Sequence, residues 1–179
     1  MPKILDRRTS RPGGLFEVET LELEFSNGVQ RTYERLLNSG LGAVIVVPLL
    51  DNDTVVLLRE YCAGFHRYEL GLVKGRLDPG ESHVEAADRE LKEEAGYGAG
   101  RIEIINSLSM APAYMSHETV VVLARDLYPC RLQGDEPEPI ETVTWPLADL
   151  HELALREDMT EGRTVAALYL ARDYLENES

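Results

Sequence analysis

Residues 75–97 read GRLDPGESHVEAADRELKEEAGY, and this stretch decides the fold and the chemistry that we expect of the chain. Within it Glu90, Glu93 and Glu94 stand at i, i+3 and i+4, so a helix of about 3.6 residues per turn places all three carboxylates on one face. Like charges at this spacing destabilise a helix. A hard divalent cation would offset their repulsion, because clustered carboxylate oxygens are the ligands that Mg²⁺ and Mn²⁺ prefer.

Both ends of this helix are specified by their residues. Asp78-Pro79-Gly80 is typical of a turn. Ser82, followed three residues later by Glu85, forms a capping-box pattern, and Gly96 is typical of the residue that ends a helix. The helix is expected to pack on a core through an apolar stripe, made up of Val84, Ala87, Leu91 and Ala95.

A run of Glu and Lys is most often a solvated acidic helix, and the three glutamates alone would favour that interpretation. The complete pattern favours a metal-binding helix over a solvated one, because the stretch resembles the Nudix box throughout. Only Tyr97 departs from it, at a position where the family has an aliphatic residue. The positions that match are Gly75, Glu81, Arg89, Glu90, Leu91, Glu93, Glu94 and Gly96.

The resemblance continues outside the box, where it points to the ADP-ribose pyrophosphatase branch of the Nudix family. It is carried by Arg59-Glu60-Tyr61, by Tyr68-Glu69-Leu70, by Pro112 and by an acidic loop before Trp145. Val73-Lys74 stands where this branch usually has Pro-Ala, which separates the chain from relatives specific for ADP-ribose.

The resemblance implies an α/β fold, an α/β/α sandwich with a mixed β-sheet, over residues 41–179. Ahead of it, residues 16–24 and 29–37 flank Asn27-Gly28, a strong hairpin signal, so residues 1–40 are expected to form a small antiparallel β module. Residues 1–14 are expected to be a mobile arm. An isolated hairpin is marginally stable in water, and the resemblance implies that this module serves in a homodimer.

Composition patterns along the rest of the chain predict further elements. Strands are expected over residues 41–50, 54–59, 101–108, 119–127 and 142–145. Amphipathic helices are expected over 147–156 and 164–176, and irregular loops over 110–118 and 134–139.

The resemblance implies that Mg²⁺ or Mn²⁺ is the cofactor in hydrolysis of a diphosphate linked to a nucleoside. The expected substrates are ADP-ribose, NADH and diadenosine di- or triphosphate, with release of AMP and a second phosphorylated product. Cations that bridge diphosphate oxygens neutralise charge that repels an attacking hydroxide, and they lower the pKa of bound water. A nearby carboxylate can then accept the proton of that water.

The resemblance also assigns roles to residues at the matching positions. Glu90 and Glu94 are the expected principal metal ligands, with Glu93 as a further ligand or the base that orients water. The remaining metal-site residues are Glu81 and the carbonyl of Lys74. The expected catalytic side chains are Glu93, Glu94, Arg89, which holds the carboxylates, and Glu118. The expected substrate-binding residues are Arg59, Glu69 and Pro112; by spacing alone, Arg59 is equally well a surface charge.

Composition narrows the range of partners. The net charge is −14, with 32 acidic and 18 basic residues, which argues against binding long nucleic acid. The start lacks the apolar segment of a signal peptide, and the longest apolar run is too short to span a bilayer. Cys62 and Cys130 form no metal-spaced pair, so we expect reduced thiols and a cytoplasmic protein.

Two alternatives remain open. One is a hydrolase that prefers dinucleoside polyphosphates, and the other is a Nudix module that senses nucleotides without catalysis. The second is disfavoured because every box carboxylate is present.

Overall fold

The computed structural model describes residues 1–11, 17–37 and 40–178, and the chain divides into two compact units. The smaller unit comprises Met1–Gly42 and Ser109–Glu118, and the larger comprises Ala43–Leu108 and Thr119–Ser179. Parts of the expected arm and first strand, residues 12–16, and of the expected turn at 38–39 lie outside the described residues.

The smaller unit contains a three-stranded antiparallel sheet in the order β1-β2-β3. Its strands are β1 (Lys3–Ser10), β2 (Glu17–Glu24) and β3 (Gln30–Leu37). The expected hairpin turn is confirmed: Gly28 has a φ of 79°, and the Phe25 N–H donates to the Val29 carbonyl at 3.0 Å. Gly supplies this left-handed conformation at little steric cost.

The expectation of a mobile arm is wrong for residues 3–10, which form β1. Two of its basic residues, Arg7 and Arg8, form ion pairs with glutamates of β2. Glu19, on the central strand, is only 3% exposed and forms ion pairs with Arg7 at 3.2 Å and with Arg35 at 2.6 Å. Such cross-strand ion pairs stabilise a sheet, but they depend on which residues the strands align. The sequence of residues 3–10 does not show this alignment, so the charged stretch was not expected to be an edge strand.

Residues 110–117 form the expected irregular segment and belong to the smaller unit. The Leu36 N–H donates to the Tyr114 carbonyl at 2.7 Å, and the Ser116 N–H donates to the Leu36 carbonyl at 3.1 Å. These bonds attach the segment to the end of β3.

The larger unit holds two sheets. The four-stranded sheet has the order β7-β4-β9-β8, with β7 (Val73–Arg76), β4 (Ala43–Pro48), β9 (Glu118–Pro129) and β8 (Tyr97–Ser109). Ile45 of β4 pairs antiparallel with Lys74 of β7 and parallel with Val121 of β9, so the sheet is mixed. The second sheet is antiparallel, in the order β10 (Glu141–Pro146), β5 (Thr54–Cys62), β6 (Arg67–Gly71).

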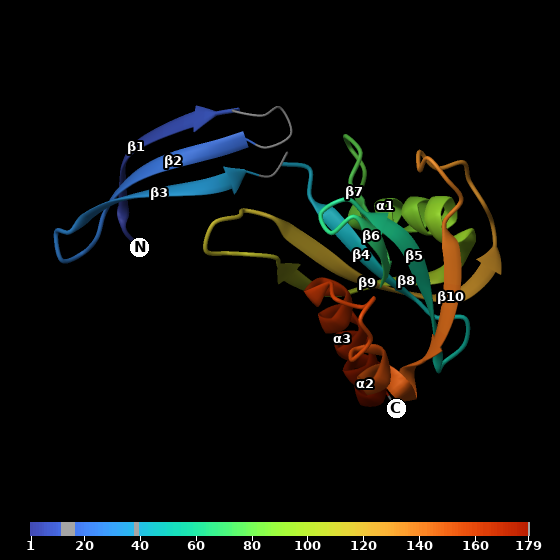
Figure 1. Cartoon of the computed structure of the whole chain (residues 1–179). Helices are drawn as coiled ribbons and strands as arrows, with labels where there is room; N and C mark the ends of the chain where they lie inside the picture. Colours follow the sequence, from blue (N-terminus) through green and yellow to red (C-terminus); the bar gives the residue numbers. More distant parts are fainter. Residues whose placement is uncertain (12–16, 38–39, 179) are drawn as a thin grey trace. The chain divides into compact units, whose positions relative to one another are not determined.

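Helices cover both faces of the central strands, with α1 (His83–Glu90) on one side and α3 (Gly162–Glu178) on the other (Figure 1). Along β4, Ile45 and Val47 pack in the cluster that contains the α3 residues, whereas Val44 and Val46 pack with the α1 residues. The sequence of such a strand is a continuous apolar run, because neither face of the strand is exposed to water. The expected α/β/α sandwich with a mixed sheet is confirmed.

The helix expected over 147–156 is shorter in the structure. A 3₁₀ turn, η2 (Leu147–Asp149), leads into the single-turn helix α2 (Leu150–Leu153). No helix in the described part of the chain has the length and hydrophobicity needed to cross a bilayer.

The limits of the box helix are confirmed. The Glu85 N–H donates to the Ser82 hydroxyl, the Ser82 N–H donates to the Glu85 carboxylate, and Gly96 ends the helix with a φ of 78°. Its apolar stripe differs at one end: Val84 is 40% exposed, and the buried stripe begins two residues later, at Ala86. The second half of the helix is a π-helical turn, η1 (Leu91–Ala95), which the sequence pattern does not reveal.

Candidate active site

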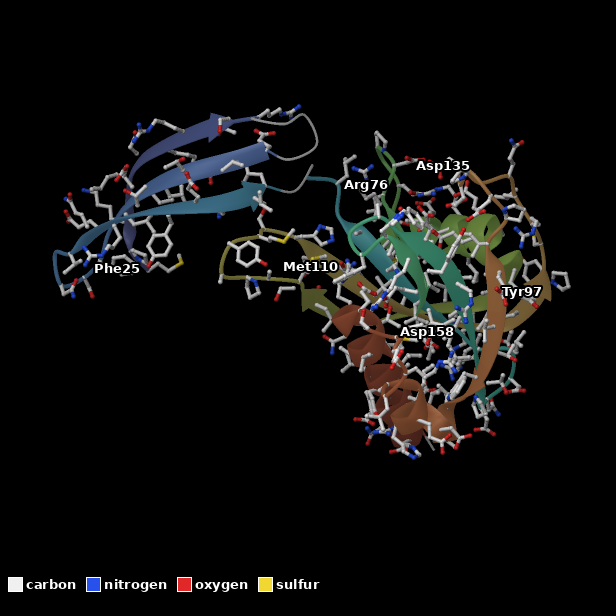
Figure 2. The ribbon with its side chains drawn as sticks, viewed as in Figure 1. Phe25, Arg76, Tyr97, Met110, Asp135 and Asp158 are labelled. Atoms are coloured by element: carbon white, nitrogen blue, oxygen red, sulfur yellow. The ribbon has the colours of Figure 1, made fainter. Side chains whose placement is uncertain are left out.

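A cavity of about 640 Å³ lies beside α1 and η1, and we call it the acidic cavity. Six carboxylates and three basic side chains line it, which gives it an excess of negative charge. The charged residues are Lys74, Arg76, Asp78, Arg89, Glu90, Glu93, Glu94, Asp135 and Glu136. Arg76, at the end of β7, and Asp135, on the loop after β9, lie at the same end of the larger unit (Figure 2).

Glu94 is the most deeply buried of these carboxylates, at 6% exposed. The backbone N–H of Lys74 donates to its Oε2 at 3.1 Å. Burial raises the pKa of Glu94 to about 8, and the negative charges of Glu90 and Glu60 act in the same direction. A carboxylate in this environment is stabilised in its charged form by a cation.

Glu90 lies directly over Gly75, and their contact explains the glycine that starts the box. A Cβ at Gly75 would stand 1.8 Å from Glu90 Oε1, closer than real Cβ contacts ever come. Burial raises the pKa of Glu90, and the charges of Glu93 and Glu136 add to the effect, while Arg89 opposes it.

Arg89 connects three carboxylates. Its Nε and Nη2 each donate to Glu81 at 2.9 Å, and its Nη1 donates to Glu90 at 2.8 Å and to Glu93 at 3.0 Å. Nη2 also donates to the Arg76 carbonyl at 3.0 Å. These bonds raise the pKa of Arg89, with the bonds to Glu81 as the largest cause. The planar guanidinium thus keeps like charges close together.

The π-helical turn gives Glu93 and Glu94 different partners. A π-helical turn inserts an extra residue into the helix, and such turns occur often at functional sites. Here Glu94 accepts a hydrogen bond from the backbone N–H of Lys74, while Glu93 accepts one from Arg89. The regular helix expected from the sequence would place these side chains differently.

Among the residues that the structure describes, no three Asp, Glu, His or Cys side chains converge closely enough to form a cation site as they stand. Glu81, Glu90 and Glu93 are bonded to Arg89 instead. The donor set nevertheless fits a hard divalent cation, because the buried Glu94 and the partly buried Glu90, both with raised pKa values, stand in a cavity of excess negative charge.

A second cavity of about 400 Å³, which we call the aromatic cavity, lies between β5, β6 and the loop before β10. Tyr61 and Tyr68 stand edge to face with ring centroids 5.8 Å apart. Glu136 lines this cavity as well as the acidic one, so the two adjoin. The lining residues are Arg59, Glu60, Tyr61, Tyr68 and residues 136–141.

Arg59 stands in the wall of the aromatic cavity, where its Nη2 is 3.2 Å from Asp158 and its Nε is 3.5 Å from Glu141. Glu69 lines neither cavity. Its carboxylate accepts bonds from the backbone N–H of Thr160 at 3.1 Å and from the Thr160 hydroxyl at 2.7 Å, and it also pairs with Arg67. These bonds lower the pKa of Glu69 and engage its carboxylate outside both cavities, and its expected contact with substrate stays a prediction.

Two expected site residues fall in the other unit. Pro112 and Glu118 belong to Ser109–Glu118, and their roles stay predictions. Asp135 and Glu136 also line the acidic cavity, although neither was among the expected site residues. The acidic run that contains them carries enough carboxylate to reach toward a metal site, but such runs are most often solvated.

Residues 41–168 match the model of the NUDIX domain. The chain belongs to the Nudix family. Residues 2–35 match the NudE-type Nudix hydrolase N-terminal domain. This Nudix protein is 50% identical over 177 residues to ADP compounds hydrolase NudE of Escherichia coli (strain K12), covering 99% of this chain and 95% of that one. It is 25% identical over 173 residues to ADP-ribose pyrophosphatase of Bacillus subtilis, covering 93% and 92%.

A solved structure gives the same assignment. The crystal structure of an ADP compounds hydrolase superposes with a TM-score of 0.92 at 49% identity, covering 99% of this chain and 96% of that one. The resemblance on which the expected fold and family rested is confirmed.

Proposed function

We propose that this Nudix enzyme hydrolyses the diphosphate bond of ADP-linked compounds, such as ADP-ribose, NADH and diadenosine di- or triphosphate. The products are AMP and a second phosphorylated compound. The observation that carries the proposal is the junction of two cavities, one acidic and one aromatic, at Glu136. The names of the relatives from E. coli and B. subtilis, an ADP compounds hydrolase and an ADP-ribose pyrophosphatase, support the choice of substrate.

Nudix hydrolases need divalent cations, and we propose Mg²⁺ or Mn²⁺ here. Glu90 and Glu94 would hold the cation, with Glu93, Glu81 and the backbone of Lys74 as the further ligands. When bound, it supplies neutralisation of diphosphate charge and a lower pKa for bound water.

The side chains of the chain itself have separable tasks. Arg89 keeps the carboxylates of Glu81, Glu90 and Glu93 in one place. Glu93, which lines the acidic cavity, takes a proton from an attacking water. Arg59 donates to phosphate oxygens from the neighbouring wall, since a guanidinium fits their geometry.

The aromatic cavity suits the nucleoside half of the substrate. Tyr61 and Tyr68 offer ring surfaces, and Pro137, Pro139 and Ile140 add apolar contacts. A planar base is held by such walls while the diphosphate reaches the acidic cavity. Because Glu136 lines both cavities, the two cavities adjoin, which supports binding of the two halves of one substrate side by side.

The smaller unit favours a homodimer. We propose that residues 1–40 act as a separate module through which two copies pair. Within the described part of this unit the sheet buries little apolar surface: Leu21 is 8% exposed, but Ile4, Leu5 and Tyr33 are 46%, 43% and 47% exposed. A three-stranded sheet with so small a core gains stability by packing on another surface. A cytoplasmic location stays a prediction.

The test is product analysis on purified protein. ADP-ribose, NADH, diadenosine triphosphate and diadenosine tetraphosphate are each incubated with Mg²⁺, with Mn²⁺ and with a chelator, and the products are separated by chromatography and mass spectrometry. We expect AMP from the ADP-linked compounds only when a metal is present. Tight binding of these compounds without turnover would contradict the proposal and favour a sensor module.

A further inference from the structure

The loop of residues 130–140, which joins β9 to β10 and which we call the acidic loop, is fastened to η1 at its first end. The Cys130 N–H donates to the Gly96 carbonyl at 3.0 Å, and the Leu132 N–H donates to the Lys92 carbonyl at 3.1 Å. The Arg131 guanidinium donates to the Glu93 carbonyl at 3.3 Å. The loop therefore satisfies carbonyl groups that the end of a helix leaves open.

The middle of the acidic loop passes over the place where the two cavities adjoin. A Cβ at Gly134 would lie 2.3 Å from Glu136 Oε2 and 3.6 Å from Glu93 Cβ, so the loop backbone rests against Glu93 with the Glu136 side chain folded over it. Among the described residues, none of 133–139 forms a main-chain hydrogen bond. The position of Glu136 accordingly depends on how the loop is held further along.

The far end is held by a side chain from β6. The Tyr68 hydroxyl donates a short hydrogen bond to Glu138 Oε1, and the Tyr68 ring is steadied by its contact with Tyr61. The bond and the charge of Glu138 raise the pKa of Tyr68, so the hydroxyl stays a donor. Pro137 and Pro139 flank the bonded glutamate and restrict the backbone on both sides of it.

We propose that Tyr68 is a positioning residue: through Glu138 it holds the acidic loop across the junction of the two cavities and fixes Glu136 beside Glu90. The effect of Tyr68 on turnover rests on the proposed function, but its effect on the position of the loop does not. Loss of the hydroxyl removes the tie at Glu138, so that residues 133–139 are held only from the η1 end and from Ile140, which packs against the core next to β10, among the contacts described. The wall of the aromatic cavity and the carboxylate at the junction then become mobile together.

The first test measures motion and needs no substrate. Backbone ¹⁵N relaxation is recorded for the amides of residues 133–136 and 138 in the wild type, Tyr68→Phe, Glu138→Ala and Tyr61→Phe. Tyr61→Phe is the matched control, because the Tyr61 hydroxyl bonds to His66 at 2.6 Å and not to the loop. We expect order parameters near the rigid value of about 0.85 in the wild type and the control, and a fall toward about 0.6 in the other two variants.

The second test is a double-mutant cycle on kcat/KM with ADP-ribose. Tyr68→Phe and Glu138→Ala should each lower kcat/KM by about fivefold, and the double variant should lose little more than either, because both remove one tie. Glu138→Gln, which keeps an acceptor, should retain most of the activity. The corresponding cycle of Tyr61→Phe with Glu138→Ala should be multiplicative.

The two tests separate the possible failures. Order parameters that do not change in Tyr68→Phe, or effects of Tyr68 and Glu138 that simply multiply, would overturn the positioning role. If no ADP-linked compound is hydrolysed by the wild type, the proposed function fails, while the relaxation measurement still decides whether Tyr68 holds the loop.

Discussion

Gly75→Ala is the substitution that tests the geometry of the acidic cavity most economically. The new Cβ would stand 1.8 Å from Glu90 Oε1 and 1.9 Å from its Cδ. Real Cβ contacts essentially never fall under 3.0 Å, so the Glu90 carboxylate must move by at least 3.0 − 1.8 = 1.2 Å. A misplacement of about 1 Å in a catalytic group can cost about 10²-fold in rate, and we expect a loss of that size in kcat.

The fold should survive this substitution. Gly75 does not have the positive φ that would strain alanine, and a glutamate at the edge of a cavity can rotate away from the methyl group. The assays are kcat and KM with ADP-ribose over a range of Mg²⁺ concentrations, and the thermal midpoint of unfolding. Gly162→Ala is the matched control, since its Cβ would meet nothing within 4 Å, and it should match the wild type in both assays.

The effect must also act through Glu90. In the Glu90→Ala background there is no carboxylate to displace, so Gly75→Ala should add little further loss. Two results would refute the reasoning: a Gly75→Ala enzyme with kcat close to the wild type, or an equal loss with and without the Glu90 side chain.

Three further substitutions test other parts of the account. A lysine in Arg89→Lys cannot bond Glu81, Glu90 and Glu93 at once. The substitution should lower kcat by at least tenfold, about 1.4 kcal/mol of activation free energy, and should lower the urea midpoint of unfolding. An unchanged urea midpoint would contradict the role of Arg89 in linking the carboxylates. Ser82→Ala removes the N-cap acceptor of α1 and should cost about 1 kcal/mol of unfolding free energy, measured by denaturant titration, with Ser10→Ala as a surface comparison; equal midpoints for the two would argue against the cap. The pKa of Asp158 is held below its ordinary 3.8 by Arg156 and, to a smaller extent, Arg59, so its charged form stabilises the fold above that pH and this stabilisation is lost as the pH falls through the lowered value. Asp158→Asn should therefore unfold at a lower temperature than the wild type near pH 6, and this difference in unfolding temperature should shrink below pH 3.8. An equal difference at both pH values would contradict a stabilising role for the charged form of Asp158.

The sequence predicts the larger unit well because its signals are local. Ser82 with Glu85 and Gly96 define the ends of a helix by bonds within a few residues, and the unbroken apolar run of β4 implies a strand covered on both faces. The family resemblance adds the α/β/α arrangement and the mixed sheet.

What the sequence does not reveal depends on contacts between distant residues. The sequence of β1 predicts a solvated arm. In the structure β1 is part of a sheet, in which Glu19 forms ion pairs with Arg7 and Arg35 of the neighbouring strands. The π-helical turn that separates Glu93 from Glu94 has no residue signature in the stretch.

Glu69 and Glu136 also show that contacts between distant residues decide where a side chain lies. Glu69 sits in a matching motif, yet its carboxylate is engaged by Thr160, which is 91 residues away in the chain. Glu136 lies in an acidic run that most often is solvated, yet it lines both cavities because Tyr68 and η1 hold its loop.

The central claim is that the glutamates of α1 and η1 bind a divalent cation that engages a diphosphate. A crystal structure with Mn²⁺ and a non-hydrolysable methylene analogue of ADP-ribose, with anomalous scattering recorded for manganese, tests it directly. The account predicts an anomalous peak about 2.0–2.3 Å from carboxylate oxygens of Glu90 and Glu94 and close to the analogue's phosphorus oxygens. A fully bound analogue with no manganese beside those two carboxylates would contradict it.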